Sequence, residues 1–365
     1  MAAYLLRFAF HSPLTTHYSP PTIHHMIYRS KAPLRIGLAG GGTDVSPYTE
    51  RYGGAILNAT INLYAHASIE STGDNYIILN DANGQQELRF EWSHQLPIDG
   101  NLDLLKGVYN HIQQKYSLPI SGFKLTTSVD TPAGSGLGTS STLVVAIIGA
   151  FAEMLRLPLG EYDISKMAYA IERNDLGFAG GRQDQYAATF GGVNFMEFSS
   201  IDKVVVNPLR IRPEIIQELE NNLVLFYTGY SRKSGSIIRE QQQNVLDNNW
   251  ESVEAMHQLK KQAVLMKEAL IKGRLGDLGE LFDFGFTYKR KMATGIANDL
   301  IENIYAAVRS AGATGGKISG AGGGGFMFFY CPGNTRFPVI KTLDSFAGQV
   351  WPFSFTNEGL VTWCL

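Results

Sequence analysis

Short segments rich in hydrophobic residues, alternating in part with polar ones, occur through the first half of the chain, and this pattern is typical of β-strands. We predict strands near residues 34–37, 55–62, 64–71 and 123–129. A mostly apolar stretch over 143–155 predicts a helix, and hydrophobic residues at helical spacing predict a second helix over 164–173. The first half of the chain therefore combines strands with at least two helices.

The pattern changes beyond Pro208, where helical spacing becomes more frequent. The elements predicted there are a strand over 223–228, long helical stretches within 237–272, a helix over 299–311 and a strand over 326–330. We therefore predict two domains, over residues 26–208 and 209–365. Residues 1–25 show neither period and are rich in Pro, Ser and His, so we expect a disordered extension there.

Composition narrows the classes of function. With 365 residues, 44% of them hydrophobic, the chain can bury a proper core, and a net charge of −2 gives no strong field for nucleic acid or an anionic membrane. The longest apolar run, 143–155, is shorter than the roughly 20 residues that span a bilayer. Two cysteines could form at most one disulfide bond, which is too few to stabilise a chain of this length. We expect a cytoplasmic protein that binds a small molecule, with no nucleic-acid or membrane partner.

A glycine-rich segment lies between the strand predicted over 123–129 and the following helix. Phosphate binding needs several backbone N–H groups that converge on one anion, and a helix N-terminus adds a favourable dipole. The segment lacks the lysine of a Walker A sequence, and a serine at a helix start can also act simply as an N-cap. We favour phosphate binding, with these candidate residues: Gly134, Ser135, Gly136, Leu137, Gly138, Thr139, Ser140 and Ser141.

A second glycine-rich segment lies between the last predicted helix and the last predicted strand. Gly320, Gly322 and Gly325 satisfy the G-x-G-x-x-G spacing of dinucleotide-binding folds. Those folds need a strand before the glycines and a helix after them, the reverse of the order predicted here, which excludes them. A hairpin turn would explain two or three glycines, but residues 317–325 hold five, which predicts close backbone approach to a ligand or a neighbouring loop.

Four polar residues are candidates for a site near these loops: Arg35, Asp44, Glu172 and Asp184. Taken singly, each has a simpler explanation. Asp44 can cap its own glycine turn, and Glu172 can belong to a solvated helix face. Asp184 is the stronger candidate, because the glycine pairs at 180–181 and 191–192 permit a tight path past a ligand.

Taken together and in this order, residues 31–35, 132–141 and 317–325 resemble the three motifs of the GHMP kinases, the family of galactokinase, homoserine kinase and mevalonate kinase. The resemblance runs from about residue 28 to the C-terminus. It implies an α+β fold, with an N-terminal domain like ribosomal protein S5 domain 2 and a ferredoxin-like C-terminal domain. It also implies ATP and Mg²⁺ in the cleft between the domains. Residues 32–44 are most similar to the sugar kinases that act on heptose 7-phosphates, with bacterial fucokinases next.

The resemblance also implies roles for individual residues. Residues 134–141 would wrap the ATP phosphates, and Ser140 and Glu172 would hold Mg²⁺. Asp184 would face the acceptor hydroxyl, and Arg35 would lie near the phosphoryl group in transfer. The substrate would contact Gly41, Gly42, Thr43, Asp44, Gly322 and Gly323.

Arg182 departs from the family pattern, because many members have an apolar residue at this position. A guanidinium group matches phosphate oxygens well, so we expect Arg182 to bind a phosphate on the substrate. The alternative is an ion pair with Asp184, two residues further along the chain.

The expected reaction is ATP-dependent phosphorylation of the anomeric hydroxyl of D-glycero-D-manno-heptose 7-phosphate to the 1,7-bisphosphate, on a GDP-heptose route to surface polysaccharide. Phosphoryl transfer needs chiefly positioning and charge neutralisation, which glycine-loop amides, Mg²⁺ and a cation supply. The alternatives are a fucokinase-like sugar kinase and a non-catalytic sugar sensor built on the same fold. The chain is also a candidate to form a homodimer.

Overall fold

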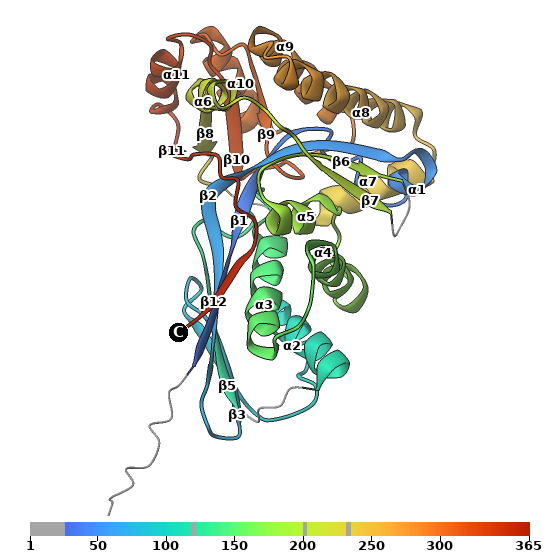
Figure 1. The fold of residues 1–365 in the computed structure, drawn as a ribbon. Coiled ribbons are helices and arrows are strands. Elements are labelled where there is room, and N and C mark those ends of the chain that lie inside the picture. Colours follow the sequence, from blue (N-terminus) through green and yellow to red (C-terminus); the bar gives the residue numbers. More distant parts are fainter. Residues whose placement is uncertain (1–25, 118–121, 200–202, 231–234) are drawn as a thin grey trace, which may run out of the picture.

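The computed structural model describes residues 26–117, 122–199, 203–230 and 235–365, and the predicted extension over 1–25 lies outside them. Two β-sheets with helices packed against them form an α+β fold, which confirms the predicted fold class (Figure 1). Among the described residues, no helix is both long enough and apolar enough to cross a membrane.

In the part of the chain that the structure describes, the larger sheet has eight strands, with β12-β1-β2-β5-β3-β4 as its main order. Strand β6 pairs with residues 54–59 of β2, and β7 pairs with β6. All pairings are antiparallel except that of β3 with β5. The strands are β1 (Ile27–Ala39), β2 (Gly54–Ser71), β3 (Tyr76–Asp81), β4 (Gln86–Glu91), β5 (Phe123–Val129), β6 (Val193–Phe198), β7 (Val204–Pro208) and β12 (Val361–Cys364).

Helices α2, α3 and α4 lie along one side of this sheet, and α5 follows near its upper end (Figure 1). Their bounds are α2 (Asp103–Tyr116), α3 (Thr139–Leu155), α4 (Glu161–Ala170) and α5 (Gln183–Phe190), with a short α1 (Tyr48–Tyr52) after β1. A π-helical turn over Ile171–Asp175 continues α4. Alternate residues of β5 are buried, as its sequence pattern predicts.

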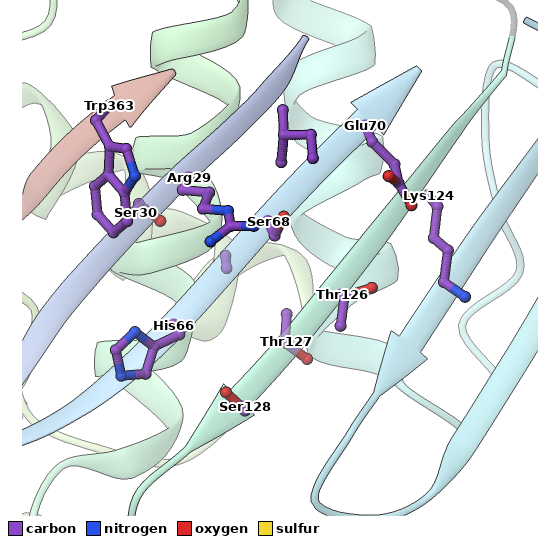
Figure 2. Close-up of a pocket in the computed structure, with 12 residues that line it drawn as sticks. Arg29, Ser30, His66, Ser68, Glu70, Lys124, Thr126, Thr127, Ser128 and Trp363 are labelled. Carbon is purple, nitrogen blue, oxygen red and sulfur yellow. The ribbon is translucent and has the colours of Figure 1, made fainter. Parts of the chain in front are cut away.

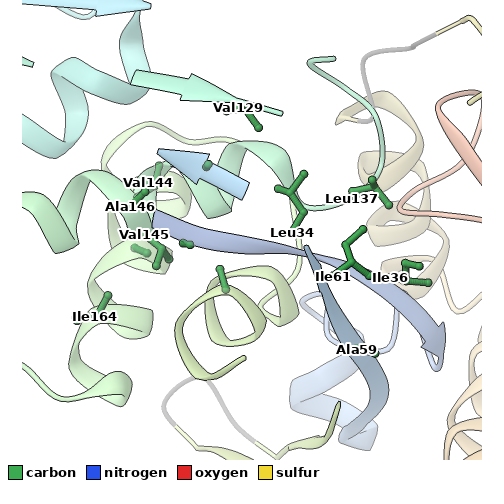
Figure 3. Packing of buried hydrophobic residues seen from close by; sticks show 14 of the residues in the cluster. Leu34, Ile36, Ala59, Ile61, Val129, Leu137, Val144, Val145, Ala146 and Ile164 are labelled. Atoms are coloured by element: carbon green, nitrogen blue, oxygen red, sulfur yellow. The ribbon is translucent and has the colours of Figure 1, made fainter. Parts of the chain in front are cut away.

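The core of this half lies between the sheet and α3. Figure 3 shows Leu34 and Ile36 of β1 and Ile61 of β2 in the same cluster as Val144 and Val145 of α3. All five side chains are fully buried. This packing fixes β1 and the start of α3 relative to each other, and both carry candidate site residues.

The second sheet has four antiparallel strands in the order β11-β8-β10-β9. Its strands are β8 (Leu223–Tyr227), β9 (Gly315–Ile318), β10 (Phe326–Tyr330) and β11 (Gln349–Trp351). The helices of this half are α6 (Pro213–Asn222), α7 (Gly235–Leu246), α8 (Trp250–Ile271), α9 (Leu278–Lys289), α10 (Asp299–Ser310) and α11 (Arg336–Leu343), with a 3₁₀ turn over Leu275–Asp277. Every residue of β10 is buried.

Three features differ from the sequence analysis. The segments over 55–62 and 64–71 form one long strand, β2, instead of two. A short strand, β9, precedes the second glycine-rich segment, which therefore lies in a β9–β10 hairpin. The chain also returns to the first sheet at its end, where β12 pairs with β1 (Figure 1). The predicted division at residue 208 did not anticipate that return.

Candidate active site

The loop between β5 and α3 presents backbone groups at a helix start. Gly134, Gly136 and Gly138 have φ values of 72°, 83° and 82°, a region that favours glycine. Gly138 is the N-cap residue, and no side chain caps α3. The alternative in which a serine caps this helix is therefore wrong. The N–H groups of the first turn are placed to bind an anion.

The second glycine-rich segment packs directly on this loop. A Cβ on Gly136 would lie 2.7 Å from the Ser319 carbonyl oxygen, and a Cβ on Gly320 would lie 2.8 Å from the Gly136 Cα. The Ser319 hydroxyl donates to the Gly136 carbonyl at 2.9 Å, and the Phe326 N–H donates to the Ser135 carbonyl at 2.9 Å. Of the two predicted causes for these glycines, the approach of a neighbouring loop is therefore confirmed.

Gly322 and Gly323, predicted to contact the substrate, lie against Ile296. A Cβ on Gly322 would lie 2.8 Å from the Ile296 carbonyl oxygen, and the Gly323 N–H donates to the same carbonyl at 2.8 Å. Chain packing accounts for both glycines, and their predicted role in substrate binding receives no support from the fold.

Arg35 and Asp184 form an ion pair beside the glycine loop. Asp184 lies in the first turn of α5, and its Oδ1 accepts the Arg35 Nε at 2.7 Å and lies 2.6 Å from Nη2. The Arg35 Nη1 donates to the Gly136 carbonyl at 2.8 Å. A Cβ on Gly138 would lie 3.2 Å from the Asp184 Cγ. The fold thus brings the predicted acceptor-activating carboxylate, a guanidinium and the phosphate loop together.

Glu172 is buried, so the interpretation as a solvated helix face is wrong. Its Oε2 accepts the Gln185 Nε2 at 2.5 Å, and Gln185 also donates to the Ser141 hydroxyl at 3.0 Å. Burial raises the pKa of Glu172, and the nearby Asp184 charge adds to this rise, while Arg173, Ser141 and Gln185 oppose it. Gln185 was not among the predicted site residues, and an isolated glutamine in a helix gave no signal for it.

Ser140 and Ser141 occupy different environments at the start of α3. Ser140 is exposed, whereas Ser141 is buried and contacts the Glu172 carboxylate. The structure therefore places Ser141 against Glu172 and leaves the Ser140 hydroxyl accessible from solvent.

Asp44 connects the turn at 40–44 to the segment that carries Asp184. Its Oδ2 accepts the backbone N–H groups of Arg182 at 2.8 Å and Gln183 at 3.0 Å. Thr43, not Asp44, closes the turn, since its hydroxyl donates to the Gly40 carbonyl at 2.9 Å. Asp44 therefore caps the start of α5, and the interpretation that it caps its own turn is wrong.

The alternative in which Arg182 forms an ion pair with Asp184 is wrong. The Arg182 Nη2 lies 2.6 Å from the Glu50 Oε1, and its guanidinium lies 5.4 Å from the centre of the Tyr169 ring. Arg182 is the N-cap residue of α5, and side chains two positions apart at a helix start do not face each other. With its charge paired to Glu50 in the interior, Arg182 also gains no support as a phosphate contact.

Two buried lysines that the sequence analysis missed lie close enough to Arg35 to interact with its charge. The Lys289 ammonium, at the end of α9, donates to the Gly41 carbonyl at 3.2 Å. The Lys317 ammonium, in β9, donates to the Gly37 carbonyl at 3.0 Å. The pKa of Lys289 is lowered to about 8 and that of Lys317 to about 7. Burial is the main cause for both, the positive charge of Arg35 contributes to both, and Asp44 opposes the shift at Lys289. Only the position of Lys317 at the head of a glycine motif hinted at either residue.

A separate hollow of about 410 Å³ lies on the first sheet. Figure 2 shows that Arg29, His66, Ser68, Thr126 and Ser128 line it from neighbouring strands. None of the residues that line it belongs to the Arg35–Asp184 site, so this hollow is not the candidate active site.

The glycine loop, the start of α3 and the Arg35–Asp184 pair form one site, and comparison with known proteins identifies its class as that of a sugar kinase. Residues 103–192 match the GHMP kinases N-terminal domain, and residues 266–342 match the GHMP kinases C-terminal domain. The chain belongs to the GHMP kinase family.

Individual relatives show which members of the family this chain resembles. The chain is 46% identical over 335 residues to the D-glycero-alpha-D-manno-heptose 7-phosphate kinase of Campylobacter jejuni, which covers 92% of this chain and 98% of that protein. A crystal structure named as a D-glycero-D-manno-heptose 1-phosphate kinase from Bacteroides thetaiotaomicron is 45% identical, with a TM-score of 0.77, and covers 92% of this chain and 98% of that chain. Lactococcus lactis galactokinase, at 18% identity and a TM-score of 0.72 over 92% of this chain and 95% of that chain, shares the fold.

Proposed function

We propose that the protein transfers the γ-phosphoryl group of ATP to the anomeric hydroxyl of D-glycero-D-manno-heptose 7-phosphate. The observation that carries this proposal is the Arg35–Asp184 pair beside the glycine loop, in a chain that is 46% identical to a heptose 7-phosphate kinase. The name of the Bacteroides relative places the substrate phosphate at position 1 instead. Both names describe a heptose that already carries one phosphate.

The glycine loop and the start of α3 are the proposed site for the ATP phosphates. Positive φ angles at Gly134, Gly136 and Gly138 turn the backbone around a small volume, and the first turn of α3 lacks a side-chain cap. These features fit a polyphosphate, because they supply N–H donors without a competing side chain. ATP, when bound, supplies the phosphoryl group.

Mg²⁺ is proposed to bind between the ATP phosphates and the side chains of Ser140 and Glu172. Mg²⁺ usually keeps several waters and uses one or two protein carboxylates together with substrate phosphates. Its site therefore needs no cluster of three ligating side chains, and among the described residues there is none. Glu172 fits the ion, because a cation would relieve the repulsion between its buried carboxylate and the partly exposed carboxylate of Asp184.

Asp184 is proposed to accept the proton of the acceptor hydroxyl. Both contacts from Arg35 go to Oδ1, so the pair fixes the direction of the carboxylate while Oδ2 can meet the hydroxyl. Arg35 also bonds the glycine loop, which places its positive charge where the phosphoryl group would pass. The Arg35 guanidinium would thus orient the carboxylate of Asp184 and also stabilise the negative charge of the phosphoryl group in transfer.

The cellular setting and assembly are further parts of the proposal. Cys331 and Cys364 are both free, which supports a reducing compartment such as the cytoplasm. We also propose that the enzyme can form a homodimer, which sedimentation at several protein concentrations would test.

A coupled ADP-release assay over a panel of sugars tests the function. We expect turnover with heptose 7-phosphate to exceed that with free heptose, fucose, galactose or mannose, and ³¹P NMR to place the new phosphate on the anomeric oxygen. Efficient turnover of fucose would favour the fucokinase alternative. Sugar binding without any ADP release would favour a sensor. A new phosphate at position 7, formed from heptose 1-phosphate, would assign the reaction that the name of the Bacteroides relative describes.

A further inference from the structure

The buried lysines Lys289 and Lys317 face one small region around Gly41. Each ammonium group has a backbone carbonyl as its hydrogen-bond partner, one in Gly41 and one in Gly37. Only 2% of Lys289 and 4% of Lys317 is exposed. Two ammonium groups have therefore been removed from water close to the Arg35 guanidinium, an arrangement that opposes folding unless an anion balances it.

The acidic groups nearby are already engaged. Asp44 attracts Lys289, but its Oδ2 accepts two backbone N–H groups at the start of α5. Asp184 is paired with Arg35. Lys317 is repelled by both Lys289 and Arg35. The three basic groups, Arg35, Lys289 and Lys317, thus outnumber the two carboxylates that face them, next to the candidate active site.

Gly41 leaves room between the two ammonium groups. Its φ lies outside the left-handed region, so the backbone conformation does not require glycine here. A Cβ on Gly41 would lie 3.9 Å from the Lys317 Nζ and 4.0 Å from the Lys289 Nζ, and beyond its chain neighbours no other described heavy atom would be closer. Gly41 itself is partly exposed. Glycine at this position therefore leaves the side of both ammonium groups that faces Gly41 uncovered by a side chain.

We infer that Lys289 and Lys317 bind the phosphate group that the sugar substrate already carries, in the space at Gly41. This inference rests on the proposed function. The ammonium groups bond the carbonyls of Gly37 and Gly41, at the turn that leads to Asp44, whereas the glycine loop of the nucleotide site contacts the guanidinium of Arg35. This position suits the end of a sugar whose reacting hydroxyl lies at Asp184.

The protonation of Lys289 and Lys317 is expected to change when a phosphate group binds between them. A phosphate dianion between the two lysines would stabilise their charged forms and raise both pKa values toward the ordinary range. The groups that face the lysines are Arg35 and Asp44, and the lysines also face each other. Phosphate binding would therefore draw protons onto both ammonium groups.

The test is the kinetics of Lys289→Met and Lys317→Met, with Lys291→Met as the matched control. Lys291 is exposed and lies 3.7 Å from Glu251, outside the site. Charge-assisted hydrogen bonds are worth about 1.5–3 kcal/mol, which is about 10- to 100-fold in binding. We expect KM for heptose 7-phosphate to rise at least about tenfold in each test variant. KM for ATP should stay within about twofold, and the control should match the wild type.

Gly41→Ala supplies a second variant that keeps both lysines. Its added methyl group fills part of the space, so KM for the sugar phosphate should rise while KM for ATP stays constant. A rise in KM for ATP alone, in any of the three test variants, would assign the lysines to the nucleotide and overturn the inference. An unchanged KM for heptose 7-phosphate in both lysine variants would overturn it as well.

Thermal melting with inorganic phosphate separates this inference from the proposed function. With the nucleotide site filled by a non-hydrolysable ATP analogue, added phosphate should raise Tm of the wild type and of Lys291→Met. It should not raise Tm of the Lys289→Met/Lys317→Met double variant. Equal shifts in all proteins would overturn the inference. If the wild type fails to phosphorylate any heptose phosphate yet shows this pattern, the proposed function fails and the phosphate site stands.

Discussion

The stability of the protein is expected to rise as pH increases from about 7 toward 10, and Lys317→Met should remove a large part of that rise. Burial lowers the pKa of Lys317 from its ordinary 10.5 to about 7. Between these values the unfolded chain binds a proton at this lysine that the folded chain has released. Raising the pH therefore favours the folded state across this window.

The magnitude follows from the width of the window. At about 1.36 kcal/mol per pKa unit, the interval between about 7 and 10.5 limits the effect to about 5 kcal/mol. Methionine would avoid the burial of the charge but would lose the bond to the Gly37 carbonyl, a loss of about 1 kcal/mol. We therefore expect Lys317→Met to be more stable than the wild type by about 2–4 kcal/mol near pH 7.

Urea denaturation at several pH values between 7 and 10 measures this effect. The stability difference between Lys317→Met and the wild type should shrink as the pH rises, whereas Lys291→Met should follow the wild type. Groups common to all three proteins cancel in the comparison. Parallel profiles for the wild type and Lys317→Met would refute the reasoning, because they would mean that Lys317 keeps an ordinary proton affinity in the folded state.

Four further substitutions test the site. Asp184→Asn should lower kcat by about 10²- to 10⁴-fold and leave ATP affinity nearly unchanged, as measured by ADP release and nucleotide titration; near-normal turnover would contradict its role. Ser140→Ala and Glu172→Gln should each raise the Mg²⁺ concentration for half-maximal rate, and an unchanged half-saturation in both would exclude them as ligands. Glu50→Gln removes the negative charge that faces Arg182 and should destabilise the fold by about 1–3 kcal/mol in urea denaturation, with KM for the sugar phosphate nearly constant.

The glycine loop was predictable from the sequence because the residues that form it are neighbours along the chain. Gly134, Gly136 and Gly138 adopt positive φ directly before an apolar helix, and a strand–loop–helix order is readable from local pattern. The meeting of Arg35 and Asp184 was not readable in this way. Their proximity was expected only from the resemblance to a known family, since 149 residues separate them.

The lysines show where sequence reasoning failed. Lys289 and Lys317 bond carbonyls that lie 248 and 280 residues away, across the junction of the two sheets. Nothing in the local pattern marks either lysine as buried. Arg182 shows the opposite kind of failure. It lies two residues from Asp184 in the sequence, which suggested that both belong to the active site, but at the start of α5 its guanidinium is paired with Glu50 instead.

The return of β12 to the side of β1 has a consequence for how the chain folds during its synthesis. The second sheet and its helices lie between two parts of the first sheet in sequence, so the ribosome completes them before β12 emerges. Until then β1 has β2 on one edge and an open row of hydrogen-bonding groups on the other, which is a site for wrong pairing. Pairing with β12 closes that edge, and it can form only after the second sheet has been synthesised.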